Sequence, residues 1–315
     1  MQTDFGYQLV RLNNGICSVR SLADHETFHP VVGPVAEAEA LYVNQLQLRQ
    51  RIQNTTGEFV IWDVGLGAAA NVLTALRAMR DINSQLRVIS FDHTQAPLEF
   101  ALKHARDLGY FGGYEEPLAG LLRAQKMTFQ NGEQTVNWEF QLGDFPAWLD
   151  SHVVGRNSRR AAQSISSPAR EDARPTTFPP APHAILFDAY SPAKNPAMWT
   201  LPLFTNLFKL LNPQRPCTMP TYSRSTILRV TLLLAGFYVG VGHATGMKEE
   251  TTIAANRLDL ITEPLGQRWL ERAQRSHSAE PMTDPVYRTA PLSVGSLEKL
   301  RAHPQFHAGN EVCPP

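Results

Sequence analysis

The stretch that most constrains the fold lies between residues 59 and 76 and reads FVIWDVGLGAAANVLTAL. An apolar strand ends near Asp63, passes through Gly65-Leu66-Gly67, and continues into a helical pattern. A glycine turn between a strand and a helix lets a ligand approach the backbone closely. Its spacing fits two cofactors, a dinucleotide with Ala70 in the last place of the pattern, and S-adenosylmethionine with Asp63 before the first glycine.

The chain then alternates between strand and helix patterns, which predicts an α/β fold with a largely parallel sheet. A hairpin around Asn131-Gly132 is expected to carry the third core strand. The last two strands follow each other with no helix between them, so the end of the sheet is expected to be antiparallel. The predicted core strands cover residues 59–64, 87–92, 135–141, 183–188, 217–222, 237–241 and 250–255.

Segments of different composition flank and interrupt this pattern. Residues 1–56 are expected to form an N-terminal extension, a β-hairpin followed by a helix. Residues 57–260 would form the cofactor-binding domain, and 261–315 a Pro-rich C-terminal tail. Within the domain, residues 155–182 are rich in Ser, Arg, Pro and Ala without an apolar period, which is typical of a flexible insertion.

Composition limits the classes of function. The 315 residues have a formal net charge of zero, which gives no support for a strong nucleic-acid binder but does not exclude a local basic patch. The three cysteines are far apart and have no metal-ligand spacing, so we expect reduced thiols and no metal site. No signal segment or membrane-spanning run is evident, and we expect a cytoplasmic protein.

Acidic residues mark the ends of four predicted strands, where ligands bind in doubly wound sheets. These residues are Asp63, Asp92, Asp144 and Asp188. Asp92 is placed to accept hydrogen bonds from ribose hydroxyls, and Asp144 to contact an adenine amino group. Asp63 would repel a pyrophosphate but suits a cationic ligand bearing an amino acid. The set therefore favours S-adenosylmethionine over a nicotinamide cofactor, and a Rossmann-like, seven-stranded class I methyltransferase sheet with an antiparallel last strand.

The segment DAYSPAKNPAMW, from Asp188 to Trp199, leaves the predicted fourth strand on the acceptor side. Methyl transfer to an amine requires an unprotonated nitrogen, and Asp188 is placed to orient the amine or to accept its proton. We predict Asp188 and Tyr190 as catalytic residues. Lys194, Asn195 and Trp199 are expected to contact the acceptor.

Four strings carry a resemblance to a known family: DVGLGAAANVLTAL, DAYSPAKNPAMWT, TYSRSTILRVTLLLAGF and GMKEETTIAA. In this order, over residues 59–255, the chain resembles the MnmC-type methyltransferases. The resemblance implies methylation of the aminomethyl group of 5-aminomethyl-2-thiouridine at the tRNA wobble position. In some members the methyltransferase is fused to an FAD-dependent oxidase. Because 315 residues leave no room for that domain and contain no second dinucleotide turn, we expect a stand-alone methyltransferase here, with a separate oxidase acting upstream.

Carried over by motif, the resemblance assigns Asp63, Gly65 and Gly67 to the cofactor, Asp92 to its ribose, and Asp144 to the neighbourhood of the adenine. Asp188 becomes the acceptor-side acid. Three further residues are candidates for site contacts. They are Lys248, on the acceptor or an RNA phosphate, and His29 and Glu37, closing over the cofactor.

The sequence also departs from the family pattern. The segment 212–216 lacks the Pro-Gly-Gly that often precedes the fifth strand, and Pro220 is unusual inside a sheet. With the neutral charge, these departures leave the acceptor open. The alternatives are a methyl- or aminopropyltransferase of the same fold acting on a small amine, an NAD(P)-binding oxidoreductase, and a non-catalytic binding module.

Overall fold

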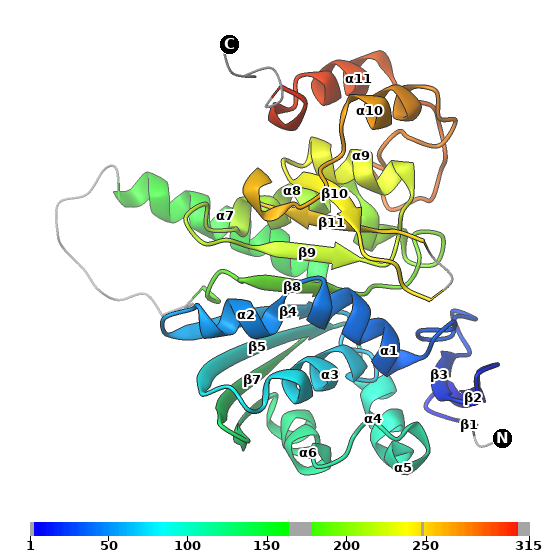
Figure 1. Ribbon diagram of the computed structural model, residues 1–315, viewed down its shortest axis with the longest axis vertical. Helices are drawn as coiled ribbons and strands as arrows, with labels where there is room; N and C mark the ends of the chain where they lie inside the picture. The colour runs from blue at the N-terminus through cyan, green and yellow to red at the C-terminus, as the bar shows by residue number, and fades with distance from the viewer. Residues whose placement is uncertain (1–2, 164–177, 247–248, 308–315) are drawn as a thin grey trace, which may run out of the picture.

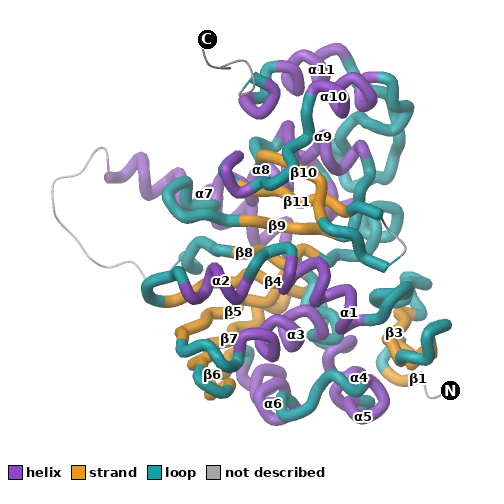
Figure 2. The backbone as a smooth tube through the Cα atoms, in the orientation of Figure 1, coloured by secondary structure: helices purple, strands orange, loops and turns teal. Residues whose placement is uncertain are grey.

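The protein is built around one eight-stranded sheet with helices on both faces (Figures 1 and 2). The computed structural model describes residues 3–163, 178–246 and 249–307. Across the sheet the strands run in the order β10-β11-β9-β8-β4-β5-β7-β6. Their bounds are β4 Glu58–Val64, β5 Ser84–Asp92, β6 Lys126–Asn131, β7 Gln134–Leu142, β8 Ala184–Phe187, β9 Thr218–Thr221, β10 Tyr238–Gly242 and β11 Thr251–Ala255.

The strand directions confirm the Rossmann-like methyltransferase sheet. The five central strands are parallel, and β11 lies antiparallel between β9 and β10. The sheet has one strand more than the seven predicted, because β6 pairs with β7 as a hairpin at the edge. From β4 the chain builds outward to β5 and β7, then returns to the other side of β4 as β8. This reversal places a crevice at the carboxyl ends of β4 and β8.

Side chains that alternate along the strands build two apolar layers. In β4, Phe59 and Ile61 face one cluster, whereas Val60 and Trp62 face the other. The first cluster includes residues of α3 (Ala70–Met79), α4 (Ala96–Lys103) and α6 (Glu115–Ala124), with α5 (Ala105–Leu108) following α4. The second includes residues of α7 (Phe145–Gln163), α8 (Leu201–Leu210) and α9 (Thr226–Leu234). Strands covered on both faces explain the continuous apolar runs.

The N-terminal region contains the predicted hairpin, β2 (Tyr7–Arg11) with β3 (Cys17–Ser21), to which β1 (Thr3–Asp4) adds a third strand. The helix predicted over residues 35–52 is interrupted. It consists of α1 (Pro34–Ala38), a π-helix η1 (Glu39–Asn44) and α2 (Leu48–Gln53). The π-helix buries three consecutive apolar residues, Leu41, Tyr42 and Val43.

The residues after 260, where the sequence suggests only a Pro-rich tail, contain the helices α10 (Gln267–Gln274) and α11 (Val294–Arg301). Trp269 and Leu270 of α10 and Leu300 of α11 are buried in the second apolar cluster. The predicted insertion at 155–182 begins inside α7, and its residues 164–177 lie outside the described residues. The proposed domain boundaries remain predictions.

Pro220 lies in β9, opposite Ile253 of β11. The parallel ladder between β8 and β9 contains only the pair Ala184 and Thr218. Proline has no N–H to donate, so a short ladder here is physically reasonable. Arg51 of α2 bonds across the start of these strands, donating to the Thr218 hydroxyl and to the carbonyls of His183 and Pro216.

Replacing this arginine should therefore weaken the fold. We expect Arg51→Met to lower the free energy of unfolding by about 2–3 kcal/mol, because a charged donor is lost and buried acceptors are left unpaired. Urea unfolding would measure the change. The control is Arg49→Met on the same helix, which removes an exposed ion pair with Asp81 and should cost much less. Equal losses in the two variants would contradict the assigned role of Arg51.

Candidate functional site

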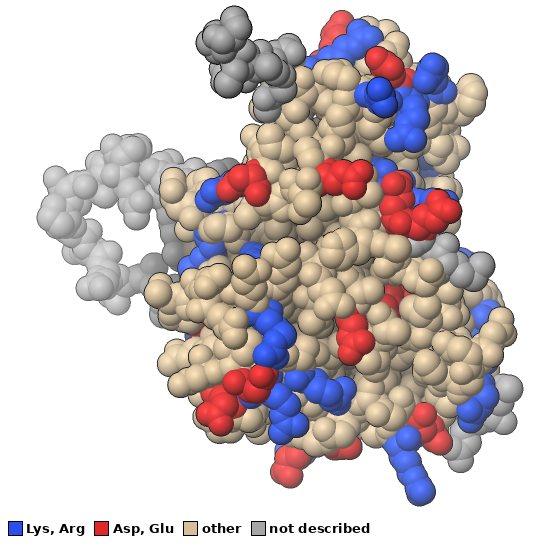
Figure 3. Space-filling model, in the orientation of Figure 1, with Lys and Arg blue, Asp and Glu red and all other residues tan. Residues whose placement is uncertain are grey.

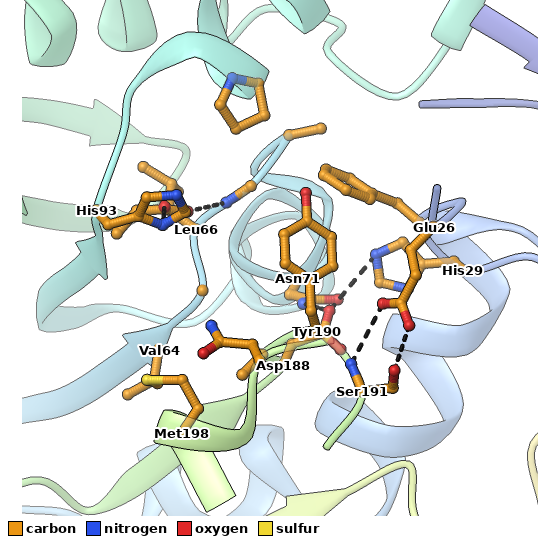
Figure 4. A pocket seen from close by; sticks show the side chains of 18 of the residues that line it. Glu26, His29, Val64, Leu66, Asn71, His93, Asp188, Tyr190, Ser191 and Met198 are labelled. Carbon is orange, nitrogen blue, oxygen red and sulfur yellow. Dashed lines mark hydrogen bonds and ion pairs between the residues drawn. The ribbon is translucent and has the colours of Figure 1, made fainter. Parts of the chain in front are cut away.

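A cavity of about 760 Å³ lies at the carboxyl ends of β4, β5 and β8. Such a volume is typical of a small-molecule or cofactor site. Its walls come from the glycine turn after β4, the loops after β5, β7 and β8, and the segment that follows β3. Figure 4 shows side chains from these separate segments converging on one space.

The glycine turn fits closely against the loop after β8. Gly65 and Gly67 have φ values of +95° and +50°, which side-chain-bearing residues rarely adopt. A Cβ atom on Gly65 would lie 2.7 Å from the carbonyl oxygen of Asp188. A Cβ on Gly67 would lie 3.2 Å from the Phe28 ring. Both predicted glycines line the cavity, and their backbone forms a cradle that a side chain would fill.

Asp92, at the end of β5, lines the cavity and fixes the turn. Its Oδ2 accepts a hydrogen bond of 2.9 Å from the Gly67 N–H, and its Oδ1 lies 3.2 Å from Nδ1 of His93. The carboxylate hydrogen bond therefore holds the second glycine against β5. This position is compatible with the predicted contact to a ribose.

Asp144 also lines the cavity, together with Gly143, Phe145 and Pro146. Its Oδ1 accepts a hydrogen bond of 2.7 Å from the N–H of Ala147 in the first turn of α7. The residue thus caps a helix in addition to facing the cavity. Its predicted contact with an adenine stays a prediction.

Asp63 is the one predicted cofactor residue that is not among the cavity lining. Its side chain is buried, and Oδ2 accepts a 2.7 Å hydrogen bond from the Ser90 hydroxyl. Within the described residues Oδ1 has no hydrogen-bond partner. Burial raises the pKa of Asp63 to about 7, although the Ser90 hydrogen bond opposes this rise. Its predicted contact with the cofactor remains a prediction.

The buried carboxyl group of Asp63 predicts a pH-dependent effect of its neutral analogue. The folded pKa is about 7 against an ordinary value of 3.8. The ionised form of Asp63 therefore destabilises the folded state as the pH rises from about 3.8 to about 7. The loss of stability is complete above about pH 7. We expect Asp63→Asn to raise the free energy of unfolding by about 1–2 kcal/mol at pH 8 and by less at pH 5, because an amide N–H without an acceptor offsets part of the gain.

Urea titrations at the two pH values measure this difference, with the exposed Asp107→Asn as control. An equal effect at pH 5 and pH 8 would contradict the raised pKa. S-adenosylhomocysteine titrations on the same variant test the predicted cofactor contact separately. A loss of affinity would support the contact.

Asp188, the predicted acceptor-side acid, lines the cavity directly after β8. Nδ2 of Asn71, in the first turn of α3, donates a 2.7 Å hydrogen bond to its Oδ2. Nε2 of His29 lies 3.6 Å from the same oxygen (Figure 4). Sequence reasoning missed Asn71, although it lies only four residues after Gly67, where a helix N-terminus faces the cavity.

His29 and Glu37 both line the cavity, as the sequence suggests. Nδ1 of His29 lies 3.8 Å from Oε1 of Glu37. Burial by itself lowers the pKa of His29, but the carboxylates of Asp188 and Glu37 outweigh it and hold this pKa above its ordinary value. The backbone of His29 is left-handed, with φ +47°. The ring is thus held between two carboxylates in an unusual backbone conformation.

The other predicted acceptor residues are placed differently from one another. Tyr190 and Asn195 line the cavity, whereas Lys194 is exposed and is not part of the lining. Trp199 is buried behind the cavity, where its Nε1 donates a 2.7 Å hydrogen bond to the Tyr190 carbonyl oxygen. Trp199 therefore holds the backbone of Tyr190, and its predicted contact with the acceptor stays a prediction. Lys248 lies outside the described residues.

Glu26 is a second cavity residue that the sequence did not reveal. Its carboxylate accepts hydrogen bonds from the N–H and the hydroxyl of Ser191 (Figure 4). These bonds connect the segment after β3 to the loop after β8, across 165 residues of sequence. A residue in the N-terminal region thereby closes one wall of the cavity.

The charges in the cavity fit S-adenosylmethionine, which carries a sulfonium and an ammonium group. Among the described residues, five carboxylates line the walls, from Glu26, Glu37, Asp92, Asp144 and Asp188, against the single guanidinium of Arg20. Carboxylates suit cationic groups and oppose a pyrophosphate. The glycine cradle, Asp92 and Asp144 would hold the cofactor, whose methyl group is activated on the sulfonium. In the described part of the chain, no group of three or more His, Cys, Asp or Glu residues is arranged to hold a metal ion.

Comparisons with known proteins agree with this geometry. The family described as S-adenosyl-L-methionine-dependent methyltransferase matches residues 175–257. The chain is 24% identical over 280 residues to the tRNA 5-methylaminomethyl-2-thiouridine biosynthesis bifunctional protein MnmC of Pseudoalteromonas atlantica, covering 84% of this chain. It is 26% identical over 250 residues to the MnmC protein of Pseudomonas syringae pv. syringae, covering 75%. The chain spans about a third of the length of these relatives, 36% and 33%.

Solved structures share the fold. MnmC2 from Aquifex aeolicus superposes with a TM-score of 0.62 at 20% identity, covering 95% of this chain and 83% of that one. A spermidine synthase in complex with the transition-state analogue AdoDATO superposes with a TM-score of 0.51 at 11% identity, covering 96% of this chain and 87% of that one.

None of the helices in the described ranges is long and apolar enough to cross a membrane.

Proposed function

We propose that this chain, which is an MnmC-like S-adenosylmethionine-dependent methyltransferase, methylates the aminomethyl group of 5-aminomethyl-2-thiouridine at the wobble position of tRNA. The proposal that the acceptor is an amine rests on the position of Asp188. Its carboxylate faces the cavity beside the glycine turn and is held there by Asn71. The name of the MnmC relatives supports tRNA as the carrier of the amine.

Asp188 would supply the proton transfer that the reaction needs. A primary aliphatic amine has a pKa near that of lysine, about 10.4, and arrives protonated at neutral pH. Nitrogen must lose this proton before it has a free lone pair. The Asn71 amide donates to Oδ2 of Asp188 and so fixes the carboxylate. The carboxylate held in this way would receive the amine's proton.

Other residues of the cavity would position the two reactants. Gly65, Gly67 and Asp92 are proposed to hold S-adenosylmethionine, and Asp63 to balance its positive charge from behind the turn. Tyr190 and Asn195, which line the cavity, are proposed to contact the acceptor. The exposed Lys194 is proposed to contact the acceptor. Lys248, proposed for the acceptor or an RNA phosphate, lies outside the described residues.

Recognition of tRNA would depend on local contacts instead of on net charge. On the face shown in Figure 3, basic and acidic side chains are interspersed over the surface. A formal net charge of zero agrees with this mixture. We therefore propose binding of modest salt dependence. A cytoplasmic location and a separate FAD-dependent oxidase upstream belong to the same proposal.

The test is methyl transfer from labelled S-adenosylmethionine to tRNA bearing 5-aminomethyl-2-thiouridine, with the nucleosides identified by mass spectrometry. We expect 5-methylaminomethyl-2-thiouridine as the product. Putrescine and spermidine, each assayed alone, serve as small-amine acceptors. Product from these amines but not from tRNA would overturn the tRNA assignment while keeping Asp188 as an amine-side acid. Decarboxylated S-adenosylmethionine tests aminopropyl transfer in the same reaction mixture.

A further inference from the structure

His29 occupies a position that the proposed reaction does not yet explain. It leaves the segment after β3 with a left-handed backbone and enters the wall of the cavity. Its two ring nitrogens face two different carboxylates, Asp188 at 3.6 Å from Nε2 and Glu37 at 3.8 Å from Nδ1. Only 9% of the His29 side chain is exposed. A buried imidazole between two carboxylates is the arrangement of a proton relay.

We propose that His29 is a positioning residue that relays the acceptor's proton from Asp188 to Glu37. This inference rests on the proposed function, because it requires an amine that loses a proton to Asp188. In the working state the ring is neutral, with its proton on Nδ1 toward Glu37. The amine's proton passes to Asp188 and then to Nε2 of His29, while the proton on Nδ1 leaves to Glu37. The Glu37 side chain is 11% exposed and releases this proton to water. Return of the ring to its Nδ1-protonated form, by proton exchange with water, completes the cycle. Each methyl transfer releases one proton, so no oxidant or further reactant is needed.

The need for a relay follows from the surroundings of Asp188. Its side chain is 18% exposed and lines the cavity. The nearby Tyr42 and Tyr222 hydroxyls have pKa values far above neutrality because of burial. Tyrosines in that state do not accept the proton from Asp188 at neutral pH. Asn71 holds Asp188 by donating an N–H and cannot take up a proton. His29, whose Nε2 lies 3.6 Å from Oδ2 of Asp188, has a ring nitrogen that can take up this proton.

The ionisable groups around His29 come from several elements. Glu26 lies on its own segment, Glu37 on α1 and Tyr42 on η1, while Asp188 and Tyr222 follow β8 and β9. Asp63 lies beneath Asp188 at the end of β4. With both nearest partners acidic, a proton on the ring is stabilised, and removing either carboxylate should make the ring easier to deprotonate.

The first experiment needs no acceptor. The ring protons of His29 are followed by NMR as a function of pH in the protein saturated with S-adenosylhomocysteine. We expect Glu37→Gln and Asp188→Asn each to lower the measured pKa of His29 by about 1. A pKa that neither variant changes overturns the relay, whatever the substrate of the enzyme is.

The second experiment measures methyl transfer against pH. The variant is His29→Asn, because Asn tolerates a left-handed backbone. We expect it to lower kcat at least about tenfold with little change in KM. We also expect it to remove the acidic limb of the pH profile. In Glu37→Gln that limb should move to lower pH. His104→Asn is the control, since His104 also lies 3.8 Å from a carboxylate, that of Asp107, but outside the cavity.

The two experiments separate the relay from the proposed function. A wild-type enzyme that methylates no amine overturns the proposed function and the relay with it. A pKa of His29 that neither Glu37→Gln nor Asp188→Asn changes overturns the relay alone. A His29→Asn variant that keeps the wild-type kcat and the acidic limb overturns the relay even where the tRNA product is found. Unchanged affinity for S-adenosylhomocysteine in this variant shows that the cavity is intact.

Discussion

The Asp188→Asn variant is expected to lose methyl transfer by about 10²–10³-fold in kcat while it retains its affinity for S-adenosylhomocysteine. The amide has the size and shape of the carboxylate, so the loop after β8 keeps its place against Gly65. An amide, however, accepts no proton at neutral pH. The ammonium form of the acceptor would then persist in the cavity, and its nitrogen would have no lone pair to offer.

The measurement is single-turnover transfer from labelled S-adenosylmethionine, with cofactor affinity followed by calorimetry. Asp150→Asn is a matched control, since Asp150 accepts a 2.7 Å hydrogen bond from Nδ2 of Asn206 just as Asp188 does from Asn71, but on the surface. Full activity in Asp188→Asn would show that Asp188 is not the acid of the amine step. A simultaneous loss of cofactor binding would instead give it a structural role.

The sequence predicted the sheet and its ligand edge because both depend on local patterns. Apolar runs followed by Asp or by Gly-Leu-Gly mark strand ends, and parallel strands bring such ends together. For this reason the same cavity is lined by Gly65, Gly67, Asp92, Asp144 and Asp188. Asp63 is the exception. It is the penultimate residue of β4, and a side chain at such a position can point into the protein interior as easily as toward the ligand.

What could not be predicted depends on contacts between distant parts of the chain. Glu26 meets Ser191 across 165 residues, and Asn71 meets Asp188 across 117. No periodicity in a single sequence indicates such pairs. The π-helix at Glu39–Asn44 and the docking of α10 and α11 have the same origin, since tertiary burial overrides the local pattern in both. The wall that encloses the acceptor is therefore visible only in the structure.

Substitution of Gly65 tests whether this close packing creates the cofactor site. Any side chain at Gly65 meets two costs, a backbone held at φ +95° and a Cβ 2.7 Å from the Asp188 carbonyl oxygen. The Asp188 carbonyl belongs to the backbone directly after the central strand β8, so it cannot move aside as a flexible side chain would. We expect Gly65→Ala to separate the ends of β4 and β8 and to weaken S-adenosylhomocysteine binding by at least about 100-fold, which corresponds to about 2.7 kcal/mol.

Gly57→Ala isolates the reason for that loss. Gly57 has a similar φ of +87°, but a Cβ there would meet no atom within 4 Å, and Gly57 is not part of the cavity lining. Both variants carry the cost of the left-handed backbone, of order 1–3 kcal/mol in stability, and only Gly65→Ala carries the clash. If both bind the cofactor analogue like the wild type, the turn is not its cradle. If Gly65→Ala alone loses binding, while thermal unfolding shows that both variants are folded, the contact between the turn and the Asp188 backbone is what shapes the site.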